Sequence, residues 1–144
     1  MIFIKKKNIF YNYLVHMRPT TPLRRLETLE KILNFFKKNI KKFDSLRSVQ
    51  KMSESSYKSF VIKNKNNLTP IFKSNKKLDY FNKPRQFFPD TFFPNGYIDI
   101  YKTKNLLKKT LYGNSTAAYI TENVVEIDDM NNFLYFKYLL SKKV

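Results

Sequence analysis

The sequence feature that most restricts the fold is a proline-containing segment, RPTTPLR, at residues 18–24. Proline fixes φ and lacks a backbone N–H, so Pro19 and Pro22 exclude this segment from a central strand and from a helix interior. The β-rich residues 11–17 precede it, and an apolar pattern with helical spacing begins at Leu26. We therefore predict a strand, a shaped loop and a helix in this order. In an open α/β sheet such a loop lies beyond the carboxyl end of its strand, where ligands bind.

The expected helix has one apolar face. Its apolar residues recur at three- and four-residue steps, at Leu26, Leu29, Leu33, Phe36, Ile40 and Phe43. Residues 46–52 then alternate apolar and polar, as in a half-buried strand, and complete a βαβ unit. Further strands are predicted at residues 57–62, 97–101, 117–120 and 124–127, a short helix at 104–109, and a last helix that Asp129 caps. In the strand at 97–101, Tyr97, Asp99 and Tyr101 are expected on one side and Ile98 and Ile100 on the other.

The charge of the chain suggests an anionic partner but does not identify one. The 144 residues have the size of one domain, and 28 Lys and Arg against 11 Asp and Glu give a net charge of +17. Alone, this charge is typical of binding to a polyanion such as RNA, or to an anionic substrate. However, Lys, Asn, Ile, Phe and Tyr are all abundant while Gly is only 2, which is the bias of an A+T-rich coding sequence. Such a bias raises the lysine content everywhere.

Several classes of protein are excluded by composition. The absence of cysteine excludes a disulfide framework and a thiol nucleophile, and a single histidine excludes a histidine cluster for zinc. Residues 1–7 have no long apolar region of the secretory type, and the apolar run at 133–136 ends at Lys137. We expect a soluble, cytoplasmic protein with no membrane partner.

Residues 63–93 differ in character from the rest of the chain. They are rich in Lys and Asn, contain Pro70, Pro84 and Pro89, and carry seven aromatic residues, which are Phe72, Tyr80, Phe81, Phe87, Phe88, Phe92 and Phe93. An arm of this kind is either disordered or packed against something. The number of aromatic residues favours a partner surface.

Two carboxylates are the candidates for a metal site. Glu126 and Asp128 are two residues apart at the end of an expected strand, so both leave the same face. Mg²⁺ takes one or two carboxylates from a protein when phosphates complete its shell. The alternative is that Asp128 is a helix cap and Glu126 a solvated strand residue, and spacing alone favours this alternative.

Three segments, in this order and at this separation, resemble the acylneuraminate cytidylyltransferases, which make CMP-activated nonulosonic acids. The first is LVHMRPTTPLR at 14–24, similar to a family strand that ends in (Q/R)PTSPLR. The second is RQFFPDTFFPNGYIDI at 85–100, similar to RRQxxP followed by (Y/F)xPNGxIxI. The third is ENVVEIDDMNNF at 122–133, similar to ERS(I/V)(D/E)ID(T/S)xxDF. Residues 44–49 and 54–58 also fit, so the resemblance covers nearly the whole chain.

The resemblance implies a fold, a reaction and site residues. In the family a sugar hydroxyl attacks the α-phosphate of CTP, and Mg²⁺ offsets the phosphate charge. Glu126 and Asp128 match the acidic pair that holds the metal. The positions that line the sugar-acid pocket match Arg18, Thr20, Lys58 and Arg85, and Asp99 falls where sialic-acid members often have Tyr. Residues 63–93 match the dimerisation region, which predicts a homodimer.

One part of the family pattern has no counterpart here. Family members begin with a strand and a loop of the kind ARGGSK that cradles the CTP phosphates, and residues 1–17 do not resemble it. We therefore expect residues 1–144 to be the C-terminal part of a single cytidylyltransferase domain. Its α/β fold would be a partial Rossmann-like nucleotidyltransferase sheet with a protruding dimerisation arm and without the N-terminal nucleotide-binding half. By itself this chain is expected not to release pyrophosphate from CTP and a nonulosonic acid.

Two alternatives remain open at this point. The chain is a non-catalytic dimerising fragment that pairs with a full-length or N-terminal chain, or it is a basic RNA-binding protein, for example a ribosomal one. Light scattering tests the first alternative. The second predicts RNA affinity that falls steeply with salt and does not respond to CTP or Mg²⁺, and nucleic acid is the less favoured partner.

Overall fold

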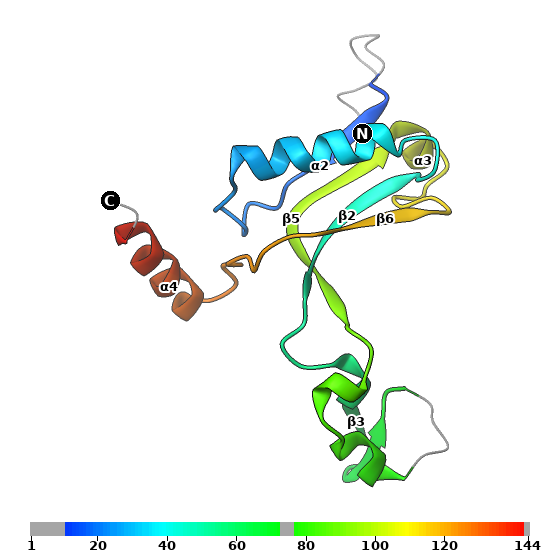
Figure 1. Ribbon diagram of the computed structural model, residues 1–144, viewed down its shortest axis with the longest axis vertical. Helices are drawn as coiled ribbons and strands as arrows, with labels where there is room; N and C mark the ends of the chain where they lie inside the picture. Colours follow the sequence, from blue (N-terminus) through cyan, green and yellow to red (C-terminus); the bar gives the residue numbers. More distant parts are fainter. Residues whose placement is uncertain (1–10, 73–76, 143–144) are drawn as a thin grey trace. The chain divides into compact units, whose positions relative to one another are not determined.

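The computed structural model describes residues 11–72 and 77–142 (Figure 1). The apolar and basic start at residues 1–7, on which the expectation about a secretory signal depends, lies outside the described residues, as do positions 73–76 of the expected arm. The chain divides into two compact units. Unit 1 takes its described residues from Met1–Gln50 and Pro94–Val144, and unit 2 is Lys51–Phe93. Each unit is described by itself.

Unit 1 is an α/β unit built on a mixed four-stranded sheet. Its elements are β1 (Tyr13–His16), α2 (Leu26–Lys38), β2 (Ser45–Lys51), β5 (Phe92–Lys102), α3 (Thr103–Leu107), β6 (Thr116–Ile120) and α4 (Met130–Ser141). The strand order is β1-β5-β2-β6, with β1 antiparallel to β5 and β2 parallel to β6. The α/β class expected from the sequence is therefore confirmed, and β5 lies between the two strands that flank α2.

The hydrophobic core lies between α2 and one face of the sheet (Figure 1). Leu26 was expected on the apolar face of this helix, but it is 71% exposed. Ile32, which the predicted spacing leaves out, and Phe36, which it includes, are 0% and 2% exposed. They belong to one cluster with Leu46, Tyr97, Ile98, Ile100 and Ala117. Leu46 and Ala117 are register partners across β2 and β6, so this parallel pair of strands forms part of the surface against which α2 packs.

The helix ends five residues before its apolar pattern does. The sequence continues the apolar spacing to Phe43, but α2 stops at Lys38. Asn39 is the C-terminal cap: its backbone N–H is shared between the carbonyls of Phe35 and Phe36, and its side-chain amide also donates to the Phe35 carbonyl at 2.9 Å, which occupies these carbonyls at the end of the helix. Phe43 still packs against the core from the turn that follows.

Two details of the predicted strands are wrong. Tyr97 packs in the same cluster as Ile98 and Ile100, although alternation along β5 placed it on the other side. No strand forms at residues 124–127. There the Val124 N–H donates to Gln50 Oε1 at 2.9 Å, and the Ile127 N–H donates to the Thr20 carbonyl at 2.7 Å. Side-chain and loop acceptors thus take the place of a neighbouring strand.

The cap predicted for the last helix is confirmed. Asp129 precedes α4, and its Oδ1 accepts a hydrogen bond from the Asn132 N–H at 2.8 Å. None of the residues of α4 is buried. None of the helices in the described part of the chain is long and apolar enough to cross a membrane.

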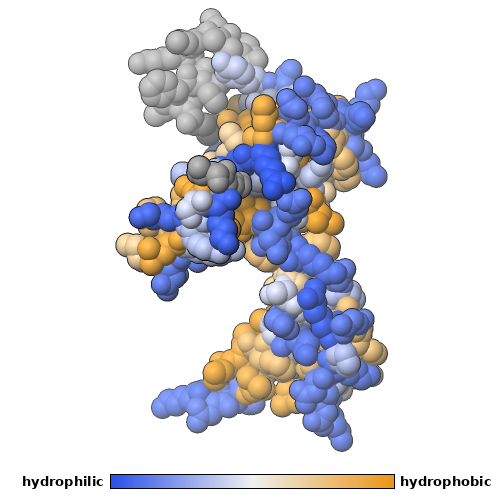
Figure 2. Space-filling view, turned by 60° about the vertical axis from the view of Figure 1, so that its left-hand side comes forward, coloured by the Kyte–Doolittle hydropathy of each residue, from blue (hydrophilic) through white to orange (hydrophobic). Residues whose placement is uncertain are grey.

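Unit 2 consists of a hairpin and three short 3₁₀ turns. The hairpin joins β3 (Phe60–Lys63) and β4 (Asn67–Pro70), and the turns are η1 (Ser56–Lys58), η2 (Leu78–Asn82) and η3 (Arg85–Phe87). Rings pack on one another here: Phe81 and Phe88 are 3% and 8% exposed. Other apolar side chains stay at the surface, as Figure 2 shows for this unit; among them are Ile62, Ile71, Phe72 and Phe87. The arm is thus ordered where it is described, with part of its aromatic content internal.

Candidate functional site

The proline loop at residues 18–24 is held in shape by Arg24. Its guanidinium donates to the carbonyls of Arg18 at 2.7 Å, Tyr97 at 2.7 Å and Gly96 at 3.1 Å. Burial lowers the pKa of Arg24 from its ordinary value. Because that ordinary value is far above neutral pH, the guanidinium still stays a cation. Arg24 therefore ties the loop to the start of the buried part of β5.

The same contact requires a glycine on the strand side. Gly96 has φ +64°, and a Cβ built there would lie 2.7 Å from Cδ of Arg18 and 3.0 Å from Oγ1 of Thr21. Thr21 is fully buried, and its hydroxyl donates to the Asn95 carbonyl at 3.3 Å. The Arg18 N–H also donates to the Gly96 carbonyl at 3.4 Å, so the loop and residues 94–96 of β5 are in direct backbone contact.

The predicted acidic pair lies beside this loop, but its two carboxylates do not leave one face of a strand. Glu126 is partly buried, and its Oε1 is 3.2 Å from Nη1 of Arg18 in an ion pair. The hydrogen bond from Ile127 to Thr20 holds the two segments together at the next residue. Asp128 is exposed, and its backbone N–H donates to Asn132 Oδ1 at 3.3 Å. The structure therefore brings Arg18, Thr20 and Glu126 together.

The donor set is chemically compatible with Mg²⁺. Glu126 and Asp128 offer hard carboxylate oxygens, and two such ligands suffice when a phosphate completes the octahedral shell. Oε1 of Glu126 is the oxygen that pairs with Arg18, so its other oxygen, Oε2, is the one that Glu126 can offer to a metal. Asp129 already serves as the cap of α4, so its carboxylate is engaged elsewhere. Within residues 11–72 and 77–142, no group of three or more His, Cys, Asp or Glu residues is placed to hold a metal without other ligands.

Asp99 has charge partners of its own. It is 4% exposed, and its carboxylate lies 3.4 Å from Nε of Arg47 on β2 and 3.9 Å from Nδ1 of His16 on β1. His16 and Asp99 are register partners across β1 and β5. The Arg47 guanidinium also lies over the Tyr112 ring, 5.1 Å from its centroid. Three strands thus meet at one buried carboxylate.

Tyr101 is the titrating neighbour of this carboxylate. Burial, and then hydrogen bonding to Tyr112 and the negative charge of Asp99, raise the pKa of Tyr101 above its ordinary value of 10.0. The phenol is therefore protonated throughout the neutral range, and ionising it costs more in the folded chain than in the unfolded one.

This shift predicts that stability falls in alkali. Because the pKa of Tyr101 is raised on folding, its contribution is fully present below pH 10.0 and is lost as the pH rises through the folded pKa. The free energy of unfolding, measured by urea denaturation at several alkaline pH values, should decline above about pH 10.0. The control is Tyr101→Phe, in which this part of the decline should disappear; an unchanged slope in the variant contradicts the prediction.

The remaining predicted site residues, Lys58 and Arg85, belong to unit 2. Lys58 ends η1 and is half-buried. Arg85 begins η3, and its Nη1 donates to the Ser53 carbonyl at 2.6 Å. Their roles in a sugar-acid pocket remain predictions.

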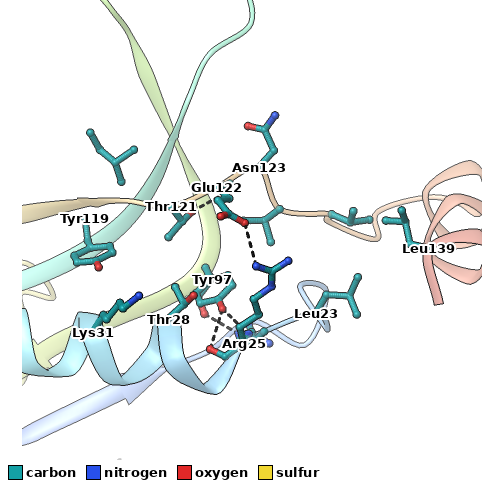
Figure 3. Close-up of a pocket in the computed structure, with 14 residues that line it drawn as sticks. Leu23, Arg25, Thr28, Lys31, Tyr97, Tyr119, Thr121, Glu122, Asn123 and Leu139 are labelled. Atoms are coloured by element: carbon teal, nitrogen blue, oxygen red, sulfur yellow. Dashed lines mark hydrogen bonds and ion pairs between the residues drawn. The ribbon is translucent and has the colours of Figure 1, made fainter. Parts of the chain in front are cut away.

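A cavity of about 370 Å³ lies on another side of the loop (Figure 3). Its lining includes Arg25, Thr28, Tyr97, Tyr119 and Glu122, and Figure 3 shows Arg25 reaching towards Glu122. These two groups are 3.7 Å apart and both largely exposed. None of the residues predicted for the site lines this cavity, so we assign the site by the ion pair and hydrogen bonds instead.

A scan against protein-family models gives no match for the chain, and a search of curated proteins gives none either.

Several residues that shape the site carry no sequence signal. Gln50 and Thr121 bridge the loop segments: the Asn95 amide donates to Thr121 Oγ1 at 2.6 Å, and Gln50 accepts from Val124. Arg47 reads in the sequence as one more basic residue of 28. Only the position of its strand next to β5 shows that it neutralises Asp99.

Proposed function

We propose that the chain belongs to the acylneuraminate cytidylyltransferases and forms the sugar-acid and metal side of a site that transfers CMP from CTP to a nonulosonic acid. The observation that carries this proposal is the convergence, in unit 1, of the first and third resembling segments with residues 94–100 of the second. Arg18 of the first segment pairs with Glu126 of the third at 3.2 Å, and Arg24 of the first donates to Gly96 of the second at 3.1 Å. If the three segments resembled the family motifs only by chance, there would be no reason for them to lie in contact in the folded chain.

Charge and shape at this point suit an anionic sugar. Arg18 presents a guanidinium whose side chain is 36% exposed, so it is anchored by Glu126 yet accessible. Arginine binds carboxylates by two parallel hydrogen bonds, and a nonulosonic acid carries one carboxylate. Thr20 lies in the same loop with a half-exposed side chain that can bind a sugar hydroxyl. The resemblance gives Asp99 a part in discriminating between sugar acids.

In this proposal Asp128 and the Oε2 atom of Glu126 hold Mg²⁺, which neutralises charge on the nucleotide phosphates, while Glu126 Oε1 stays paired with Arg18. The chain has two glycines, Gly96 and Gly113, and they are too few and too far apart in the sequence to form a glycine-rich phosphate loop. The CTP phosphates are therefore bound by another segment, and the four-stranded sheet is the part of a Rossmann-like nucleotidyltransferase sheet that carries the sugar-acid side.

The experiment that tests the proposal is titration of the chain with N-acetylneuraminic acid, monitored by calorimetry or NMR. We expect saturable binding that Arg18→Ala weakens by about 10- to 100-fold, because one charge-assisted interaction is worth roughly 1.5–3 kcal/mol. CTP with Mg²⁺ should bind more weakly to Asp128→Asn than to the original chain.

The matched control is Arg25→Ala. Arg25 follows the same loop, but its side chain is 68% exposed and pairs with Glu122 beside the cavity instead. Its removal should leave sugar-acid affinity unchanged. Equal losses in both variants indicate non-specific attraction, and no binding of any sugar acid contradicts the proposal.

Unit 2 supports the dimeric state that the resemblance implies. Its small size gives a limited core, and apolar side chains such as Ile62 at 70% and Phe87 at 51% exposure remain at the surface. Small units with a limited core often gain stability by burying such side chains between two copies. Light scattering on the titration samples reports the mass.

A further inference from the structure

Lysines gather at one end of unit 1, where α2, β5 and α3 meet. This lysine end consists of Lys37, Lys38, Lys41, Lys42, Lys102, Lys104, Lys108 and Lys109. Figure 1 shows the end of α2 beside α3. Hydrogen bonds join the segment after α2 to β5 and α3: the Lys102 N–H and the Asn105 side-chain amide both donate to the Asp44 carbonyl, at 3.2 Å and 3.0 Å. The lysine end is therefore one surface.

Its charge is almost uncompensated. Asp44 is the acid that the described residues place at this end, and it is shared between Lys102 at 3.4 Å and Lys104 at 3.5 Å. A hydrogen bond from the Asn114 N–H, assisted by these lysines, lowers the pKa of Asp44, so it is ionised at neutral pH. The surplus is about seven positive charges. The dipole of α2 accounts for Lys37 and Lys38 in its last turn, but not for the other lysines.

Composition alone does not explain this distribution. A bias towards lysine raises its frequency throughout a chain without sorting it by position in space. At the other end of α2 and around residues 122–129, acids are mixed with arginines; the acids are Glu27, Glu30, Glu122, Glu126, Asp128 and Asp129. Unit 1 is thus polarised, with one strongly basic end.

Exposed apolar side chains lie among these lysines. Leu107 is 74% exposed, the highest value for a large apolar side chain in the described residues, and Leu111 is 49% exposed. Leu107 ends α3, with Lys104 before it and Lys108 directly after. Tyr11, 57% exposed, lies next to α3 because its carbonyl accepts from Thr103 Oγ1.

We propose that the lysine end docks on the surface of an anionic phospholipid bilayer, with Leu107 and Leu111 entering the interfacial region. Lysines near an anionic leaflet each add about 1 kcal/mol of attraction, and apolar side chains beside them add burial. A nucleic acid fits less well. Its recognition favours arginine and several flat stacking rings, whereas all eight cations here are lysines, and of the three exposed side chains named above two are leucines and only Tyr11 is an aromatic ring.

This proposal differs from the expectation of no membrane partner, which rests on the lack of an apolar span. Docking on a surface requires no span. It is also independent of the proposed cytidylyltransferase function, because none of the predicted site residues belongs to the lysine end.

The test is co-sedimentation of the full chain with phosphatidylcholine vesicles, with and without phosphatidylserine. We expect binding only when phosphatidylserine is present, and weaker binding as salt rises. The triple variant Lys41→Glu, Lys108→Glu and Lys109→Glu should bind at least about 100-fold less tightly, because the loss of three lysines alone accounts for about that factor and the three new carboxylates add repulsion. Leu107→Ser should bind about tenfold less tightly.

Two matched controls make the outcome decisive. Lys63→Glu, Lys65→Glu and Lys77→Glu change the net charge by the same amount in unit 2, and Leu26→Ser removes a leucine that is 71% exposed at the other end of α2. Both should bind vesicles like the original chain. The proposal is overturned if the variants at the lysine end lose no more vesicle affinity than the controls do. It is also overturned if the chain binds vesicles equally well without phosphatidylserine. Tighter binding to single-stranded or duplex RNA, unaffected by Leu107→Ser, overturns it in favour of a nucleic acid.

Discussion

Replacing Phe36 by alanine is expected to lower the free energy of unfolding of unit 1 by about 3–5 kcal/mol. Phe36 is 2% exposed and lies in the core cluster between α2 and the sheet. Its ring also meets the Tyr13 ring edge to face, with centroids 5.7 Å apart. The substitution therefore removes buried apolar surface, leaves a cavity, and loosens the contact between α2 and the edge strand β1.

Urea denaturation followed by circular dichroism measures this loss. The matched control is Leu26→Ala in the same helix, where the side chain is 71% exposed and the change should be within about 0.5 kcal/mol. A loss below about 1 kcal/mol for Phe36→Ala would mean that α2 does not pack on the sheet in this way. Because a domain has roughly 5–15 kcal/mol in total, the expected loss is a large fraction of its stability.

Replacing Gly96 by alanine is expected to cost about 2–3 kcal/mol of unfolding free energy. The backbone φ of +64° is unfavourable for a residue with a Cβ, at roughly 1 kcal/mol or more. The added Cβ would also lie 2.7 Å from Cδ of Arg18, so the Arg18 side chain must move. Because Arg18 is paired with Glu126, this movement should also weaken sugar-acid binding at the proposed site.

Gly113→Ala separates the two effects. Gly113 has φ +70°, and its added Cβ would meet Cβ of Asp44 at 2.7 Å, at the lysine end. The backbone strain is similar, but Arg18 is not touched. Thermal unfolding should show both variants destabilised, and titration should show a loss of sugar-acid affinity only for Gly96→Ala. Equal affinity in the two variants would argue against Arg18 as the carboxylate-binding group.

The local parts of the fold follow from the sequence. The start of α2 at Leu26, the burial of Phe36 and the Asp129 cap of α4 all depend on interactions between residues a few positions apart. The end of α2 was overestimated because Phe43 continues the apolar spacing while Asn39 satisfies the last carbonyls and stops the helix. The strand expected at residues 124–127 does not form because its hydrogen bonds go to Gln50 and Thr20, which lie far away in the sequence.

The sequence alone predicted which residues belong to the candidate site and their order along the chain, but not their contacts. The proline loop, the segment at residues 85–100 and the acidic pair were identified, but spacing placed Glu126 and Asp128 on one face of a strand. The structure separates them: Glu126 turns to Arg18, and Asp128 is exposed. Such a pairing depends on two segments more than 100 residues apart, and periodicity carries no information about it.

The sequence by itself determined the proline-shaped loop, the amphipathic helix after it, the helix cap and the α/β class, because each results from short-range geometry and hydrophobic spacing. Only the tertiary structure decided which charges meet. The position of β5 between β1 and β2 brings His16 and Arg47 to Asp99, and the direction of α2 takes its last lysines to those of α3. Strand order and helix direction are set by packing of the whole unit, so the partners of Asp99 and the lysine end become visible only in the folded chain.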